Sequence, residues 1–265
     1  MSGFSAAWLA LREPADLAAR SRTLTAATGV ALHGRRPVRA VDLATGTGSN
    51  VRFLSGYLPI EQEWLVVDHD EALLRTLPGR LPNVPLEVRH ADLSGASLAA
   101  AVRGRDFVSA SALLDLVSEA WMTAMADAVV RERAIALFVL SYDGRIELTP
   151  PDASDAPVRE FVNRHQRIDK GFGVALGPAC VDVAERMFAE RGYRVRRETS
   201  DWTLGAGSAE LQRQLIDGWA GAAIEIEPRA SAEVSAWRRR RHEHVAAGRS
   251  AMVVGHADLL AVPQD

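Results

Sequence analysis

Residues 41–50 read VDLATGTGSN, an apolar stretch that passes an aspartate and then turns through two glycines. Glycines let the backbone approach a ligand, and a helix that begins after them offers free N–H groups. A P-loop would need a Gly-Lys-Ser/Thr ending, which the stretch lacks. The dinucleotide pattern Gly-x-Gly-x-x-Gly begins with Gly46 and Gly48 but meets Val51 at its third position. Asp42 would repel a pyrophosphate, so the loop favours a ligand with a cation or an amino group.

The same loop resembles the first motif of the class I S-adenosylmethionine-dependent methyltransferases, an acidic residue followed by three glycines at alternate positions. Ala44 stands in place of the first glycine, one small residue for another. The resemblance implies that the loop backbone and the acidic residue lie against the methionine part of the cofactor. The residues assigned to this part of the site are Asp42, Ala44, Thr45, Gly46, Gly48 and Asn50.

Two further acidic positions agree with the resemblance. The family has a carboxylate at the end of the second strand that binds both ribose hydroxyls, and Asp68 stands there, with His69 beside it and Asp70 as a helix cap. Asp68 follows the glycines by about 20 residues, the spacing of ribose recognition. After the third strand the family has an acidic residue facing the adenine amino group. The resemblance assigns that place to Asp92, with the Leu93 backbone beside it.

The segment RDFVSAS at 105–111 runs through small residues into LLDLV, as the corresponding family segment does. Ser109 and Ser111 are assigned to the cofactor site on this likeness. The family's acceptor pocket lies beyond the fourth and fifth strands. The predicted catalytic residues there are Asp115, Tyr142 and His165.

Methyl transfer from a sulfonium is an in-line displacement, so the protein mainly positions the acceptor and excludes water. A general base helps a hydroxyl acceptor and matters less for an amine. Each candidate also has a structural interpretation: Asp115 as a helix cap, Tyr142 as a packing residue and His165 as a solvated helix residue. His165 lies in the segment NRHQRIDKGFGVALG, whose Gly171 and Gly173 allow the segment to act as a mobile lid. One or two of the tryptophans could line an aromatic acceptor pocket, with core or interface packing as the default interpretation. They are Trp8, Trp121, Trp202, Trp219 and Trp237.

Short apolar, β-rich segments alternate with helix-like stretches along the first half of the chain. The expected strands are 38–44, 63–68, 84–93, 105–111 and 132–143, and the expected helices are 50–58, 70–77, 97–102 and 119–131. We interpret Asp143-Gly144 as a turn that ends the fifth strand. This alternation predicts a parallel sheet with helices on both faces.

The predicted fold class is α/β, a Rossmann-like, doubly wound, seven-stranded sheet that is mostly parallel with an antiparallel last strand. That last strand lies within 250–263. We expect a single domain over 1–265, an N-terminal helical cap over 1–36, and insertions at 151–178 and 208–248 that form the acceptor site or a lid.

Composition narrows the functional classes. The formal net charge of -3 argues against general attraction to nucleic acid. Cys180 is the single cysteine, which excludes an intrachain disulfide and a cysteine-cluster metal centre, and we predict no metal site. No apolar run has the length of a membrane span, and the N-terminus lacks a signal-peptide pattern, so we expect a cytoplasmic protein.

The sequence predicts an enzyme that transfers a methyl group from S-adenosylmethionine to a small-molecule acceptor, leaving S-adenosylhomocysteine. Two alternatives remain open: an RNA or protein methyltransferase that uses the basic run WRRRRHEHV at 237–245, and a partner protein that binds the cofactor without catalysis. A third alternative, an NAD(P)-dependent oxidoreductase, is disfavoured by the missing third glycine. His242 and His244 stand two apart and diverge on a helix, which argues against a metal site.

Overall fold

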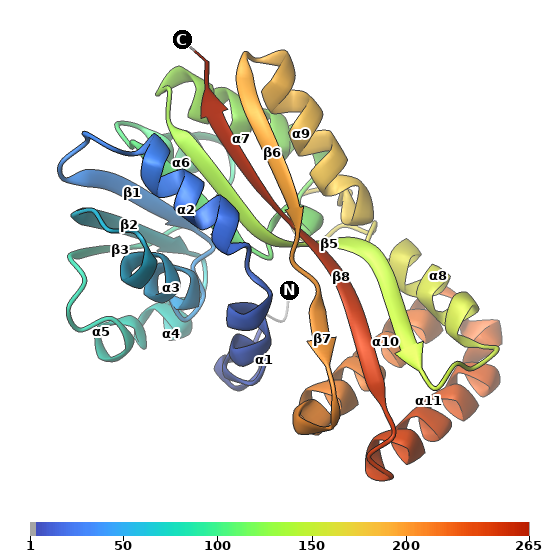
Figure 1. The fold of residues 1–265 in the computed structure, drawn as a ribbon. Coiled ribbons are helices and arrows are strands. Elements are labelled where there is room, and N and C mark those ends of the chain that lie inside the picture. The colour runs from blue at the N-terminus through green and yellow to red at the C-terminus, as the bar shows by residue number, and fades with distance from the viewer. Residues whose placement is uncertain (1–3, 265) are drawn as a thin grey trace.

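The computed structural model describes residues 4–264, and its centre is a single eight-stranded sheet (Figure 1). The strand order is β3-β2-β1-β4-β5-β8-β6, and β7 pairs with β8 outside this path. The parallel strands are β1 (Val38–Leu43), β2 (Gln62–Asp68), β3 (Leu86–His90), β4 (Phe107–Ser111) and the first part of β5 (Ile135–Thr149). The antiparallel members are β6 (Tyr193–Thr199), β7 (Trp202–Leu204) and β8 (Ala251–Pro263). The predicted α/β class and antiparallel last strand are confirmed, with one strand more than the seven expected.

Helices cover both faces of the sheet, as predicted. On one face α2 (Arg22–Ala31), α3 (Ser49–Tyr57), α4 (Glu71–Leu74) and α5 (Leu77–Arg80) contribute to a core with Ala40 and Val66. On the other, α6 (Gly95–Val102), α7 (Glu119–Arg131) and α9 (Cys180–Glu190) contribute to a core with Val41 and Val67. Consecutive strand residues therefore serve opposite cores, the alternation that a two-sided sheet requires.

A second region extends the sheet beyond its parallel part. Figure 1 shows β5 and β8 continuing toward α8 (Asp155–His165), α10 (Ala209–Ile226) and α11 (Ser231–Ala246). These elements share a third core with β7, which includes Trp202, Trp219 and Trp237. The remaining helical segments are α1 (Ala6–Ala19), η1 (Leu114–Leu116), η2 (Gly177–Ala179), η3 (Ala206–Ser208) and η4 (Pro228–Ala230).

The predicted end of the fifth strand at Asp143-Gly144 is wrong. The strand continues to Thr149, and its pairing with β8 shifts register between Tyr142 and Ile146. Gly144 has φ 92°, a left-handed conformation that glycine adopts without a steric cost. Asp143-Gly144, which the sequence indicated as a turn, therefore forms a β-bulge, which bends the strand without ending it.

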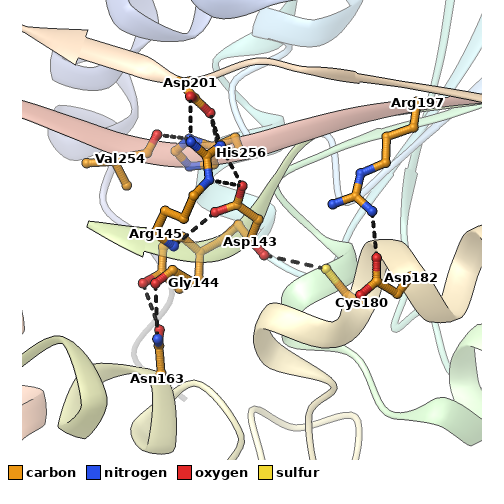
Figure 2. A network of polar contacts seen from close by, with 11 residues as sticks. Asp143, Gly144, Arg145, Asn163, Cys180, Asp182, Arg197, Asp201, Val254 and His256 are labelled. Carbon is orange, nitrogen blue, oxygen red and sulfur yellow. Dashed lines mark hydrogen bonds and ion pairs between the residues drawn. The ribbon is translucent and has the colours of Figure 1, made fainter. Parts of the chain in front are cut away.

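Charged side chains surround the bulge (Figure 2). Arg145 donates from Nε to Asp143 at 2.9 Å and from a terminal nitrogen to Asp201 at 3.0 Å. A Cβ built on Gly255 of β8 would be 2.1 Å from Oδ1 of Asp143. The bulge therefore requires a residue without a side chain at position 255.

The predicted cap at 1–36 contains α1 and α2, and its first three residues lie outside the described residues, as does residue 265 of the predicted single domain. The predicted insertion at 208–248 contains α10 and α11, separated at Pro228. The boundaries of the domain and of its insertions stay predictions. Within residues 4–264, no helix combines the length and apolarity needed to cross a bilayer.

Candidate functional site

A cavity of about 530 Å³ lies at the carboxyl ends of the parallel strands. This edge of an α/β sheet is where ligands generally bind. Eight of the predicted cofactor residues line the cavity: Asp42, Ala44, Thr45, Gly46, Asn50, Asp68, His69 and Ser111. The structure therefore brings together most of the residues that the sequence analysis assigned to a cofactor, and their role stays a prediction.

The glycine loop between β1 and α3 has the backbone that its motif predicts. Gly46 has φ 56° and Gly48 φ 75°, and Ala44 has φ 53° in place of the family's glycine. A side chain in the left-handed region costs about 1–2 kcal/mol, so Ala44 carries strain that glycine would not. A Cβ on Gly48 would lie 2.8 Å from side-chain atoms of both Leu77 and Leu81. Gly48 thus allows α5 to pack against the loop.

Asp68 ties the loop to the end of β2. One carboxylate oxygen accepts the Gly46 N–H at 2.8 Å, and the other accepts the Asp70 N–H at 2.9 Å. Asp68 is buried and still forms part of the cavity wall. Each carboxylate oxygen can accept a further hydrogen bond, so Asp68 can hold the loop and bind a ligand hydroxyl together.

Asp42 sits at the bottom of the same wall in a polar network. Its carboxylate accepts from Thr45 Oγ1 at 2.7 Å and from Asn50 Nδ2 at 2.5 Å. Arg20 donates to the other end of the Asn50 amide, which fixes its orientation. Burial raises the pKa of Asp42 from 3.8 to about 6, against the opposing effects of these hydrogen bonds and of Arg20.

Four predicted cofactor residues do not form part of this cavity wall. Ser109 is fully buried behind Asn50, and its hydroxyl donates to the Leu137 carbonyl at 2.9 Å. Gly48 serves the packing of α5, as described above. Asp92 is exposed after β3, and the Leu93 carbonyl accepts from the Trp121 indole.

A second cavity of about 660 Å³ adjoins the first. The two share lining from Phe4, Arg12, Ala112, Leu116 and Lys170. All three predicted catalytic residues contribute to the wall of the second cavity: Asp115, Tyr142 and His165. The structure therefore brings them together, beside the candidate cofactor site and beyond β4 and β5.

Asp115 is buried within η1, and burial raises its pKa to about 6. Its Oδ1 atom has no hydrogen-bond partner among residues 4–264. The Tyr142 hydroxyl donates to Asn163 at 2.8 Å, and burial raises its pKa, so the phenol stays neutral at physiological pH. These contacts favour Asp115 over Tyr142 as the group that receives a proton.

His165 lies in a charged cluster at the wall. Its Nε2 is 3.2 Å from Glu225, and its Nδ1 is 3.2 Å from the Lys170 ammonium. Burial is the main cause of a lowered His165 pKa, with Lys170 acting in the same direction. Neither ring nitrogen is therefore free of a partner, and His165 serves better to position Lys170 than to accept a proton.

The sequence missed several residues of the second cavity. Trp8 of α1, Trp202 of β7 and Trp219 of α10 belong to its wall. The sequence analysis allowed one or two tryptophans there and took packing as the default. Arg12 pairs with Asp16, and its guanidinium lies 5.1 Å from the Trp202 ring centroid. Arg12 and Asp16 stand four residues apart on a predicted helix, and this spacing was the one sequence signal for their pairing.

The basic run at 237–245 is largely neutralised within the chain. Arg238 and His242 both contact Asp217, Arg240 contacts Asp152, and Arg241 contacts Asp155. The run thus holds α11 against α8 and α10. Among the described residues, no group of three or more His, Cys, Asp or Glu side chains could hold a metal ion.

Comparisons with known proteins identify the fold. No protein-family model and no curated protein matches the sequence. The solved structure of the YcgJ protein from Bacillus subtilis is 13% identical, with 92% of this chain and 100% of that chain covered and a TM-score of 0.52. A methyltransferase candidate from Bacillus halodurans is also 13% identical, with 92% and 100% covered and a TM-score of 0.50. A Geobacter sulfurreducens S-adenosylmethionine-dependent methyltransferase with bound S-adenosylhomocysteine is 13% identical, with both chains fully covered and a TM-score of 0.48.

The chain has the class I methyltransferase fold. The last strand, β8, runs antiparallel between β5 and β6, as the sequence resemblance implied. At this level of identity the likeness defines the fold, and the function is argued from the two cavities.

Proposed function

We propose that this protein is an S-adenosylmethionine-dependent methyltransferase acting on a small molecule. The observation that carries the proposal is the pair of adjoining cavities with shared lining residues. One has the residue types that a nucleoside-linked amino acid needs, and the other has Trp8, Trp202 and Trp219 in its wall. Their common wall is where a methyl donor and an acceptor would meet.

The first cavity suits the cofactor in three ways. Asp68 offers carboxylate oxygens to ribose hydroxyls, and Asp42 offers a deep carboxylate to an amino group. Helix α3 begins at Ser49, and its N-cap Gly48 has no side chain to cap it, so the first N–H groups can receive a carboxylate. The volume of about 530 Å³ lies within the range of small-molecule sites.

When bound, the cofactor supplies a methyl group already activated by a sulfonium. The chain's own residues then have to orient the acceptor and exclude water. Phe4 and Leu116 contribute apolar surface where the cavities meet, and Asp115 lies beside Leu116. This arrangement supports transfer to a small acceptor rather than to a nucleic acid, because three of the four arginines in the basic run pair with carboxylates of the chain.

Calorimetric titration tests the cofactor assignment directly. We expect S-adenosylmethionine and S-adenosylhomocysteine to bind the purified protein at one site, and NAD to give no heat of binding. Nicotinamide binding without binding of the two sulfur compounds would reject the proposal. Binding of the sulfur compounds without methyl transfer to any acceptor would instead favour the cofactor-binding partner protein.

The affinity for S-adenosylhomocysteine is expected to fall about tenfold per pH unit below pH 6, because protonated Asp42 cannot pair with an ammonium group. The charge of Arg20 lowers the pKa of the Asp42 carboxyl, and the charge of Asp68 raises it.

The free energy of unfolding should change with pH in the opposite sense to the affinity. The folded protein holds the Asp42 proton more tightly than the unfolded chain, so Asp42 lowers stability as pH rises from 3.8 to about 6.

Calorimetry between about pH 5 and pH 8, a range that spans the Asp42 transition, checks this expectation. Asp42→Asn should bind weakly at every pH and show a flatter profile. A native protein whose affinity stays constant through pH 6 would contradict the contact between Asp42 and an amino group.

A further inference from the structure

The imidazole ring of His256, on β8, forms part of the wall of the second cavity. His256 is 6% exposed, so only a small part of the residue is open. Its ring packs against two aromatic rings of the same wall, with its centroid 4.9 Å from that of Trp202 and 6.2 Å from that of Tyr142. The methyl transfer proposed above gives this histidine no role, so its place in the wall needs an explanation.

A hydrogen bond determines which ring nitrogen of His256 carries the proton. Nδ1 lies 3.0 Å from the Val254 carbonyl oxygen, a contact drawn in Figure 2. A carbonyl oxygen can only accept, so Nδ1 carries the hydrogen, and Nε2 of the neutral ring keeps a lone pair. Burial lowers the His256 pKa to about 3, and the charge of Arg12 acts in the same direction. The ring is therefore neutral at physiological pH, and Nε2 is a hydrogen-bond acceptor.

The Nε2 atom of His256 is open to the cavity. It makes no hydrogen bond to any residue that the structure describes, where the ring's one bond is that of Nδ1. The polar side-chain atoms of residues 4–264 that have neither a hydrogen-bond partner nor solvent contact do not include Nε2. Nε2 therefore keeps accessible surface, and a molecule in the second cavity can reach it because the ring belongs to the cavity wall.

The aromatic neighbours of the ring have already used their own donors. Trp202 Nε1 donates to Asp16 at 3.1 Å, and the Tyr142 hydroxyl donates to Asn163 at 2.8 Å. An acceptor in a mostly apolar place loses free energy when a ligand displaces water from it without supplying a donor. The cavity therefore discriminates between two ligands of the same shape when only one of them carries an O–H or N–H group.

We propose that the second cavity binds an aromatic molecule through an O–H or N–H group that donates a hydrogen bond to Nε2 of His256. The aromatic body follows from the Trp202 and Tyr142 rings beside the imidazole, because aromatic rings gain from contact with one another. The wall of the first cavity does not include His256, so the donating group lies away from the methyl donor. His256 thus selects and orients the acceptor. The inference rests on the proposed methyltransferase function and specifies how its acceptor is recognised.

Matched aromatic probes test the contact. β-Naphthol carries an O–H donor, whereas β-naphthyl methyl ether and naphthalene share its body and cannot donate. Indole and N-methylindole provide the same comparison for an N–H donor. In ligand-observed NMR titrations of the full chain, we expect each donor-bearing probe to bind about fivefold or more tightly than its methylated partner, by the gain of one hydrogen bond. Naphthalene separates this effect from a steric clash of the added methyl group.

One variant removes the acceptor and keeps the ring. In His256→Phe, the advantage of β-naphthol over its methyl ether and of indole over N-methylindole should disappear. Naphthalene should bind within about twofold of its native affinity, because it makes no hydrogen bond to lose. His33→Phe is the matched control, since His33 is exposed after α2, and it should keep the full advantage of the donors.

A second measurement needs no variant and holds even where His256→Phe does not fold. A long-range proton–nitrogen correlation spectrum of the isotope-labelled native chain reports the protonation of each histidine ring nitrogen. We expect a protonated Nδ1 and an unprotonated Nε2 for His256. The Nε2 signal should move when β-naphthol or indole is added and stay in place with the other probes.

A protonated Nε2 in the free protein would overturn the proposal, as would equal affinities within both probe pairs or a failure of every probe to bind. A donor advantage that persists in His256→Phe would also overturn it. An advantage within one pair alone would support the contact and identify its donor as O–H or N–H. Calorimetry with S-adenosylhomocysteine keeps the two levels apart: failure there rejects the methyltransferase function, whereas failure of the probes alone rejects only the His256 contact.

Discussion

Asp68→Ala is expected to weaken S-adenosylhomocysteine binding by about 100-fold or more. The native carboxylate holds the Gly46 and Asp70 N–H groups at 2.8 and 2.9 Å and, on the proposed placement, accepts two ribose hydroxyls. Hydrogen bonds to a charged group contribute about 1.5–3 kcal/mol each, and about 1.4 kcal/mol corresponds to a tenfold change in affinity. The variant loses the ligand contacts and the support of the loop together.

Calorimetry on Asp68→Ala, Asp68→Asn and the native protein measures this effect. Asp68→Asn retains one oxygen acceptor and should fall between the other two. Asp182→Ala removes an exposed carboxylate far along the chain in α9 and should bind normally. A folded Asp68→Ala protein that binds within about threefold of native would show that Asp68 supports the loop without touching the ligand.

Gly255→Ala should lower the free energy of unfolding by about 3 kcal/mol. The added methyl would lie 2.1 Å from Oδ1 of Asp143 and 2.7 Å from Cβ of Arg145. To relieve that overlap, Asp143 must move, and its hydrogen bonds with Arg145 then break. The salt bridge between Arg145 and Asp201 is disturbed as well. Overpacking alone costs about 1–3 kcal/mol, and the lost charged contacts add to it.

Thermal unfolding provides the measurement, and a decrease of about 6–12 °C in the midpoint is expected for a chain of this size. Gly221→Ala is the matched control. This glycine lies inside α10 with no atom within 4 Å of its notional Cβ, so alanine should stabilise the helix by about 0.5–1 kcal/mol. Equal midpoints for native and Gly255→Ala proteins would mean that the bulge accommodates a side chain.

The grouping of the residues in the first cavity was predictable because a local motif determines it. Asp42, Gly46 and Asn50 belong to one strand–loop–helix unit, and Asp68 occupies the corresponding strand end in the next unit. Neighbouring parallel strands have their carboxyl ends at the same edge of the sheet. Residues at these ends therefore lie close together without help from contacts elsewhere in the chain. Ser109 shows the limit of that rule, because its strand is buried on both sides and its side chain lies behind Asn50.

The acceptor side depends on contacts that no local pattern encodes. Trp8, Trp202 and Trp219 come from a helix, a short strand and another helix that are distant in sequence. Their meeting depends on the bent continuation of β5 and β8. Asp143-Gly144 carries a turn signature by composition, yet the pairing with β8 converts it into a bulge. Tertiary pairing therefore overrode the local preference at this point.

The continuous β5 strand also limits how the protein can evolve. Side chains on a strand alternate between faces, so a deletion of one residue at 143–145 would turn Ile146, now buried in the third core, to the opposite side. Exchanges of one amino acid for another in the second cavity leave this alternation intact. Proteins of this fold with a differently lined second cavity are therefore expected to arise by substitution, with the length of this strand preserved.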